Sequence, residues 1–359
     1  MGRTGYLLSQ KEAGRSVAAV WPARYPEELL WAHNLVPAEM WDPPADIDRA
    51  DAHIQSYACG VVRRGLEFLM GDGASVADLL LFPHTCDSIQ NMGSVVKDLL
   101  REGRPCLTFY PPKWNSDDTA KDYLSGQIED LSEELRRMGL PMAEGALEEA
   151  LSWGARRTAL LNELYGLRAS GSLAAGNAAF YQAVRSREYL WPEDASKRLG
   201  EFILEKRGRR ADGATPLVFS GILPQPRDLM AQLDDLGVAV VEDDFLCCGR
   251  RFVRGEPPVF DDPWQTLAAR LFALPPCSTT GSPIQNRLRF VENLVERSSA
   301  RGVVFLTLKF CEPELFEVPS LSLALREKGI PVLVLESEIG DRTSAGLMTR
   351  LEAFLEALP

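Results

Sequence analysis

Long apolar runs are missing from this chain of 359 residues. No apolar stretch approaches the ~20 residues that a membrane-spanning helix needs. The first residues, Met1 to Tyr6, also hold no apolar core of signal-peptide length. We therefore expect a cytoplasmic protein that has no membrane as a partner.

Positive charge is scarce as well. The chain has 39 lysine and arginine residues against 51 aspartate and glutamate residues, and its net charge is -12. Such an acidic surface repels phosphate backbones, so we expect no nucleic-acid partner. The basic cluster over 207–210 falls in an expected loop and is more typical of a solvated surface than of a site for CoA phosphates.

The seven cysteines form no CxxC pair, and their number is odd. This excludes the usual zinc-ribbon and thioredoxin-like patterns, and a cytosolic chain of this length is not a disulfide framework. No G-x-x-x-x-G-K-[ST] motif is present either, so any ATP has to be handled by another protein. For a single cysteine, the ordinary interpretation is a small buried hydrophobic residue.

The chain length predicts two or three domains. In the first 119 residues, strand-like runs over 16–21, 76–83 and 106–110 alternate with expected helices, of which those over 54–70 and 89–101 are the longest. A further helix is expected to start at Pro26, since proline and acidic residues favour a first helical turn. This alternation predicts a parallel α/β domain over 1–119.

Helical periodicity dominates from about 120 to 206, and we assign residues 120–210 to a mainly helical segment. A second α/β domain is expected over 211–359, with strands over 216–223, 238–241, 303–308 and 331–335 and a final helix over 346–358. The predicted fold class is therefore α/β, with two parallel-sheet Rossmann- or flavodoxin-like domains and a helical segment between them.

Three cysteines follow the expected strands directly. Cys86 comes after the run that ends at Pro83, Cys247 after the second strand of the second domain, and Cys311 after Leu308. Ligands collect at the carboxyl ends of parallel strands in open α/β sheets. The sequence thus predicts that these thiolates converge on one iron–sulfur cluster in the interdomain cleft.

The segments around these cysteines resemble the 2-hydroxyacyl-CoA dehydratase and benzoyl-CoA reductase family, in its iron–sulfur, D-component type of subunit. Residues 84–88 read His-Thr-Cys-Asp-Ser. Residues 243–251 carry an acidic pair and then Cys-Cys-Gly-Arg-Arg, and residues 309–313 read Lys-Phe-Cys-Glu-Pro. The C-terminal stretch is similar to that family too, so the resemblance spans nearly the whole chain.

The resemblance implies a [4Fe–4S] cluster held by Cys86, Cys247 and Cys311, which leaves one iron free of cysteine. It also implies an acyl-CoA substrate that passes through a ketyl radical anion. The implied partners are a homologous second subunit, which forms a heterodimer, and a separate ATP-hydrolysing iron–sulfur activator that delivers one electron. An open iron site is what catalytic metal centres generally need.

Several side chains next to the ligand motifs are candidates for catalysis. Ser88 and Arg251, with Gln90, are candidate donors to a substrate oxygen. His84 lies two residues from a ligand and is a candidate proton donor, although a histidine that merely closes a strand explains it equally well. The pair Asp243-Asp244 is interpreted either as a second shell around a metal or as a turn.

Three further cysteines are candidate metal ligands. Cys248 is able to replace Cys247 as the ligand, Cys59 is placed at the start of a helix whose dipole favours a thiolate, and Cys277 follows two prolines. Together with the first three they make six, the number that the family's double-cubane [8Fe–9S] branch would need. Cys106 opens a strand and is interpreted as a core residue.

The leading hypothesis is therefore the [4Fe–4S] subunit of an activator-dependent 2-hydroxyacyl-CoA dehydratase. The alternatives are a subunit of a benzoyl-CoA reductase-type aryl-CoA reductase, a double-cubane ATP-dependent reductase, and a non-catalytic partner subunit. An ordinary α/β binding protein with buried cysteines is the remaining alternative, and it predicts a colourless protein.

Overall fold

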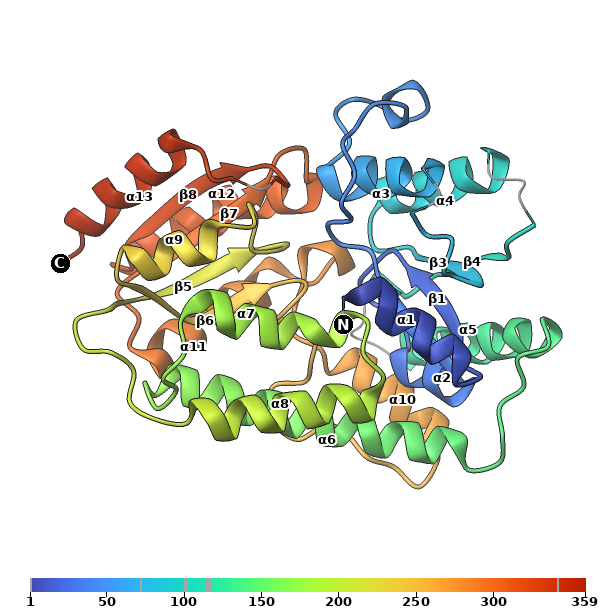
Figure 1. Ribbon diagram of the computed structural model, residues 1–359. Coiled ribbons are helices and arrows are strands. Elements are labelled where there is room, and N and C mark those ends of the chain that lie inside the picture. Colours follow the sequence, from blue (N-terminus) through green and yellow to red (C-terminus); the bar gives the residue numbers. More distant parts are fainter. Residues whose placement is uncertain (1, 72, 100–102, 114–117, 341) are drawn as a thin grey trace. The chain divides into compact units, whose positions relative to one another are not determined.

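The fold is that of a computed structural model, which describes residues 2–71, 73–99, 103–113, 118–340 and 342–359. Contacts divide the chain into two units, and each contains one parallel β-sheet (Figure 1). Unit 1 comprises Met1–Ala159, Ser186–Ser196 and Gly255–Leu274, and unit 2 comprises Leu160–Arg185, Lys197–Arg254 and Pro275–Pro359.

The sheet of unit 1 has the order β2-β1-β3-β4, and all neighbouring strands are parallel. This is the flavodoxin-like order, in which the strand order reverses between the first and third strands and leaves a ligand crevice at their carboxyl ends. The four strands are β1 (Ser16–Val20), β2 (Leu35–Glu39), β3 (Leu79–Pro83) and β4 (Cys106–Phe109).

Helices of unit 1 cover this sheet because each turns an apolar face toward it. One core cluster joins Val20 of β1 and Leu79 of β3 to Leu131, Leu147 and Leu267, which lie on three different helices. The helices are α1 (Arg3–Glu12), α2 (Glu27–Ala32), α3 (Gly60–Met70), α4 (Asp87–Leu99), α5 (Asp118–Arg137), the first part of α6 (Ala146–Ala169) and α10 (Pro263–Phe272), with short 3-10 helices η1 (Ala50–Ala52) and η2 (Ser186–Glu188).

Unit 2 repeats the same topology. Its sheet has the order β6-β5-β7-β8 and is also parallel throughout. Strands β6 and β7 are buried along their whole length, which is typical of a sheet covered on both faces. The four strands are β5 (Thr215–Gly221), β6 (Val238–Phe245), β7 (Val303–Leu308) and β8 (Val332–Ser337).

The second core lies between this sheet and two long helices. Val218 and Phe305 on the strands pack with Leu294 on one helix and with Leu321 and Leu325 on another. The helices of unit 2 are the last part of α6, α7 (Asn177–Arg185), most of α8 (Pro192–Lys206), α9 (Leu229–Asp235), α11 (Ile284–Ser298), α12 (Glu312–Glu327) and α13 (Ala345–Glu356), with the 3-10 helix η3 (Ser278–Thr280).

The predicted fold class, two parallel-sheet α/β domains, is confirmed. Helix α5 is assigned to unit 1 and α7 to unit 2 by their contacts. The division into three consecutive domains over 1–119, 120–210 and 211–359 stays a prediction. Across the described ranges, no helix combines the length and the apolarity that crossing a membrane requires.

Some element boundaries differ from those expected. The helix expected over 54–70 begins only at Gly60, because the preceding residues form turns. β6 continues to Phe245 instead of ending at Val241. The helix expected over 89–101 is α4, and its expected end at Arg101 lies outside the described residues. Helix α1 and strand β2 were not expected.

Candidate functional site

The turn that carries Cys86 joins β3 to α4. Thr85 anchors it, because its buried hydroxyl donates to the carbonyl of Pro22 (3.1 Å) and accepts from the N–H of Ala23 (3.0 Å). Lys113 Nζ donates to the carbonyls of His84 (3.1 Å) and Thr85 (2.7 Å). The turn is therefore tied to the loop that follows β1, at the point where the strand order reverses.

The Cys86 thiol is half-buried and strongly held in its protonated form. Burial, and the nearby Cys59 thiol, raise the pKa of Cys86 to about 12, against the opposing effect of the backbone N–H groups of Ile89 and Ser88. Cys59 is itself buried and is the N-cap residue of α3. A metal at this position would have to replace the thiol proton.

His84 lies in the same turn, and its imidazole is uncharged at neutral pH. Burial, and then the Lys113 charge, lower the pKa of His84 below 6.5. Its Nε2 is 3.5 Å from Asp87 Oδ1, and its ring meets the Tyr110 ring edge-on at 5.5 Å. The proposed roles of His84 and Ser88 in catalysis stay predictions.

In unit 2, the acidic residues of β6 are buried in the sheet. The carboxylate of Asp243 accepts hydrogen bonds from the hydroxyls of Tyr165 (2.7 Å) and Tyr181 (3.0 Å). It also accepts from the backbone N–H of Gly249 (2.8 Å). Asp243 Oδ1 also accepts from the backbone N–H of Phe245 (3.1 Å), so Asp243 fixes the turn that leads to Cys247 and Cys248. A role as a second shell around a metal stays a prediction.

Asp244 belongs to a buried network of two arginines and two acids. Arg250 Nε lies 3.0 Å from Asp244 Oδ1, and Arg287 Nη2 lies 3.1 Å from Asp244 Oδ2. Glu314 bridges the same two guanidiniums, with Oε1 3.0 Å from Arg250 Nη2 and Oε2 2.8 Å from Arg287 Nη2. Arg287 Nη1 also pairs with Oε2 of the less buried Glu317 (2.8 Å), so carboxylates compensate both buried guanidiniums.

The loop after β6 presents two adjacent cysteines. Cys247 and Cys248 are both buried, and their Sγ atoms are 3.3 Å apart. The backbone N–H of Cys247 donates to the carbonyl of Ile222 (3.0 Å), which follows β5. Gly249 is required here because a Cβ atom would collide with the carbonyl oxygen of Asp243.

Arg250 connects the remaining cysteines of unit 2. Its Nη1 donates to the Sγ of the buried Cys277 (3.2 Å) and to Glu314 Oε1 (3.1 Å). Glu314 lies in the first turn of α12, whose N-cap residue is Cys311. One guanidinium thus holds the loop after β6, the Cys277 segment and the start of α12 in a fixed arrangement.

The cysteines occupy equivalent places in the two units. Cys86 precedes the helix that follows β3, and Cys311 precedes the helix that follows β7, the corresponding strand in the repeated order. Cys59 and Cys277 are N-cap residues on the connections that lead into those two strands. Cys106 differs, since it opens β4 at the opposite strand end and is half-buried.

Sequence reasoning found the cysteines and missed the residues that position them. It named Arg251, which is buried, but Arg250 is the residue that joins the network. Glu314, Arg287 and Tyr165 were not predicted. For Arg287 and Glu314, the sequence signal was a charged residue on a helix that also has apolar residues facing the core. Such a signal does not identify the partner of the charge.

The donor set suits an iron–sulfur cluster, since none of the seven cysteines is in a disulfide and soft thiolate sulfur is the ligand that iron–sulfur clusters use. Within the described ranges, no three histidine, cysteine, aspartate or glutamate side chains are grouped as the ligands of a metal ion.

Comparison with known proteins matches nearly the whole chain. The sequence model described as "2-hydroxyglutaryl-CoA dehydratase, D-component" matches residues 22–358. The chain is 22% identical to the (R)-phenyllactyl-CoA dehydratase beta subunit of Clostridium sporogenes, over 98% of this chain and 95% of that protein. It is 24% identical to one of the subunits of benzoyl-CoA reductase from Thauera aromatica (90% and 86%). It is also 24% identical to the (R)-2-hydroxyglutaryl-CoA dehydratase beta subunit of Acidaminococcus fermentans (98% and 95%).

Proposed function

Because the chain belongs to the 2-hydroxyglutaryl-CoA dehydratase D-component family, we propose that it is the iron–sulfur subunit of an activator-dependent 2-hydroxyacyl-CoA dehydratase. The observation that carries this proposal is the placement of three cysteines outside any disulfide, Cys86, Cys247 and Cys311, each just after a parallel strand. Relatives named as dehydratase beta subunits support the assignment.

Cys86, Cys247 and Cys311 would hold a [4Fe–4S] cluster. When bound, such a cluster with one iron free of cysteine would supply a site for a substrate oxygen and a low-potential electron for an acyl-CoA thioester, which becomes a ketyl radical anion. The thiols of Cys86 and Cys311 lie at helix N-termini, where backbone N–H groups stabilise a thiolate.

The side chains of the chain itself would position these ligands and control protons. Lys113 holds the carbonyls of His84 and Thr85, so the turn before Cys86 keeps the direction of the thiol. Arg250 holds the three cysteine segments of unit 2 together. The uncharged His84 imidazole is suited to accept a proton, and the imidazolium formed in this way could then pass that proton to a leaving group.

Partner proteins are part of this proposal. Several relatives are named as subunits of their enzymes, so a second, homologous subunit is expected to form a heterodimer with this chain. A separate ATP-hydrolysing iron–sulfur activator would deliver the electron. A subunit of an aryl-CoA reductase is the related alternative, and the similarity to a benzoyl-CoA reductase subunit supports it.

One further observation favours a second candidate, the double-cubane reductase. Each unit places two cysteines in equivalent positions, Cys59 with Cys86 and Cys277 with Cys311, and Cys247 and Cys248 add a third pair. Six thiolates would suit an [8Fe–9S] double cubane. The two candidates therefore differ in how many of the cysteines bind iron.

Anaerobic purification followed by iron and sulfide analysis tests the proposal. A dehydratase subunit should contain about four irons per chain, and a double-cubane reductase about eight. EPR of the reduced protein would show the cluster type. A colourless protein without sulfide after anaerobic purification and reconstitution would contradict both candidates and favour an α/β binding protein.

A further inference from the structure

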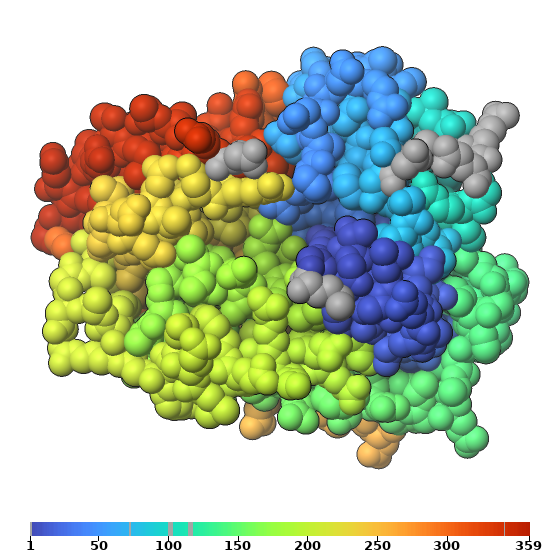
Figure 2. All heavy atoms as spheres, in the orientation of Figure 1, coloured from blue at the N-terminus to red at the C-terminus, as the bar shows by residue number. Residues whose placement is uncertain are grey.

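Two hollows in unit 2 flank one loop, which joins α8 to β5. A cavity of about 750 Å³ lies between this loop and the turn after α6, and it is lined by Ser170, Gly171 and Ser172 on one side and by residues 207–214 on the other. A second cavity of about 660 Å³ adjoins it on the other side of the same loop. The surface is hollowed beside this yellow-green loop, at the left of the space-filling view (Figure 2). Both volumes are in the range of small-molecule sites.

The loop and the turn are held in place by backbone hydrogen bonds. The N–H of Arg210 donates to the carbonyl of Gly171 (2.8 Å), and the N–H of Gly208 donates to the carbonyl of Ser172 (3.0 Å). Gly171 and Gly213 have positive φ angles of 72° and 84°, which a side chain would strain. The walls of the cavity are therefore held in place by the backbone of unit 2.

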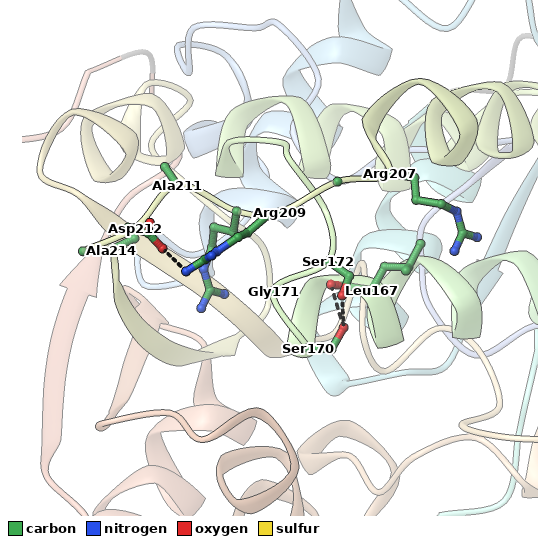
Figure 3. Close-up of a pocket in the computed structure, with 12 residues that line it drawn as sticks. Leu167, Ser170, Gly171, Ser172, Arg207, Arg209, Ala211, Asp212 and Ala214 are labelled. Atoms are coloured by element: carbon green, nitrogen blue, oxygen red, sulfur yellow. Dashed lines mark hydrogen bonds and ion pairs between the residues drawn. The ribbon is translucent and has the colours of Figure 1, made fainter.

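Positive charge is concentrated around these cavities, although the whole chain has a net charge of -12. Two of the arginines are already paired: Arg207 with Glu163, and Arg209 with Asp212 (2.7 Å). Figure 3 shows the Arg209–Asp212 contact within the loop, with the Arg207 side chain turned away from it. The Arg209–Asp212 pair is 81% exposed on both sides, so water screens it and another anion can replace Asp212.

Two further arginines have no carboxylate partner among the described residues. Arg210 lines both cavities, and its buried Nη1 has no acceptor within hydrogen-bond distance in the described part of the chain. Arg168 lines the second cavity and is buried, and its donors reach only neutral oxygens, on Val240, Ala175 and Asn177. The Asp234 carboxylate, which also lines the second cavity, offsets part of the Arg168 charge. The Arg210 donor that has no acceptor in the described part of the chain therefore favours an anionic ligand.

Hydroxyl donors face the same cavity. Ser170 Oγ lies 3.1 Å from Ser172 Oγ and 3.2 Å from the Leu167 carbonyl, and both serine hydroxyls line the cavity (Figure 3). Guanidinium and hydroxyl donors around an open, glycine-lined loop match the several oxygens of a phosphate group. We propose that the loop between α8 and β5 and the turn after α6 form a binding site for the phosphate groups of a small molecule.

This phosphate site does not depend on the proposed dehydratase function, because several kinds of small molecule carry phosphate groups. Pyrophosphate, ADP and coenzyme A present the same oxygen chemistry, and pantetheine lacks the phosphates. Calorimetric titration of the full, anaerobically purified chain with each of these four compounds would identify the source. Saturable binding of at least one phosphate compound and no binding of pantetheine is the expected result.

Two variants and a control locate the site. Arg210→Gln should weaken phosphate binding by about tenfold or more, because a charged hydrogen bond is lost. Asp212→Asn should strengthen it by severalfold, because Arg209 is released and a negative charge is removed. Arg289→Gln removes an exposed arginine of α11 outside the cavities and should leave the affinity within about twofold.

If pyrophosphate, ADP and coenzyme A show no saturable binding up to ~10 mM, the proposed phosphate site is wrong. A dissociation constant of ~10 mM corresponds to only a few kcal/mol of binding free energy. Equal losses in Arg210→Gln and Arg289→Gln would show non-specific attraction and also overturn it. Cys86→Ser should leave phosphate binding unchanged, so a failure of the cluster proposal and a failure of this one are distinguishable.

Discussion

Arg250 and Glu314 form a fully buried ion pair in which Nη1 and Nη2 lie 3.1 and 3.0 Å from the same carboxylate oxygen. The pair joins the loop after β6 to the first turn of α12. Because Arg250 Nη1 also donates to Cys277, its geometry determines where the cysteines of unit 2 are held. The interior of unit 2 is therefore organised around charges as well as around apolar side chains.

Glu314→Gln should destabilise unit 2 strongly. The substitution leaves Arg250 with Asp244 alone, which it shares with Arg287, while Arg287 keeps Glu317 as well. Removing one partner of a buried ion pair costs about 3–5 kcal/mol of unfolding free energy. Urea denaturation followed by circular dichroism measures the loss. Glu133→Gln removes an acid from an exposed pair with Arg136 and should cost less than about 1 kcal/mol. Equal losses in the two variants would contradict this account of the network.

The stability of unit 1 should fall as the pH drops below about 6.5, the ordinary pKa of a histidine side chain. Burial lowers the pKa of His33 below 6.5, and the nearby Arg136 charge lowers it further, against the hydrogen bond to the Leu140 carbonyl. The unfolded chain then binds a proton that the folded chain does not. Stability from this group is thus fully present above about pH 6.5 and is lost as the pH falls toward the lower, folded-state pKa.

Urea denaturation at pH 8, 6.5 and 5 would measure this pH dependence. His33→Gln should flatten the slope between about pH 6.5 and 5, because the titrating group is gone. His53→Gln provides a control, since His53 is exposed and its replacement should leave the slope unchanged. An unchanged slope in His33→Gln would show that other groups cause the loss.

Substitution of the proposed ligands should remove iron. We expect Cys86→Ser and Cys311→Ser to lower the iron content and the absorbance near ~400 nm, because a serine oxygen is a poorer ligand than a thiolate for a cluster. Cys106→Ser is the matched control, since this half-buried cysteine opens β4 at the other strand end. Full iron in Cys86→Ser and Cys311→Ser would show that the ligand assignment is wrong.

The same measurement separates the two cluster types. Under the single-cubane proposal, Cys59→Ser and Cys277→Ser keep the iron content near that of the wild type. Under the double-cubane alternative, each of them lowers it. Comparing Cys247→Ser with Cys248→Ser would decide which of the two adjacent thiols binds iron, since their Sγ atoms are only 3.3 Å apart.

Gly249→Ala should disrupt the loop after β6. The added Cβ would collide with the Asp243 carbonyl oxygen and with its carboxylate, so the loop has to move. We expect a loss of roughly 2–4 kcal/mol in unfolding free energy together with a lower iron content. Gly200→Ala, within α8 and with open space around its Cβ position, should instead stabilise the chain by about 0.5–1 kcal/mol. A neutral Gly249→Ala variant would show that the close approach is unimportant.

The regular α/β elements were predictable because their periodicity is local. The expected strand over 303–308 coincides with β7, and the expected strand after Ser16 coincides with β1. Strand β2 was missed because Pro37 interrupts its pattern. The structure accommodates this proline because β2 is an edge strand, where a missing N–H donor is tolerated.

The acidic end of β6 could not be predicted from local pattern. Glu242, Asp243 and Asp244 look like solvent-exposed residues, which is why the strand was expected to stop at Val241. They are buried because tyrosine hydroxyls and arginines from distant segments satisfy them. Tyr165 and Asp243, for example, lie 78 residues apart in the chain, so no sequence window contains both.

The sequence identified the cysteines of the candidate site, but the contacts that hold them in place could not be predicted from it. The strand-end positions of Cys86 and Cys311 follow from the sequence alone, since each comes directly after an apolar run. Cys59 was expected at the start of a helix, and the structure places it as the N-cap residue of α3, which begins at Gly60 and not at residue 54. The bond from Arg250 to Cys277 depends on tertiary packing and has no sequence signal.

Helix α10 belongs to unit 1, although β5 and β6 of unit 2 precede it in the chain. Leu267 and Ala268 complete the core that Ala18 and Leu29 begin. During synthesis, the ribosome therefore has to release the chain beyond Leu274 before the amino-terminal sheet acquires its full packing. Until then the part of the core that Leu267 and Ala268 cover stays exposed, and a chaperone has its best opportunity to bind the nascent protein.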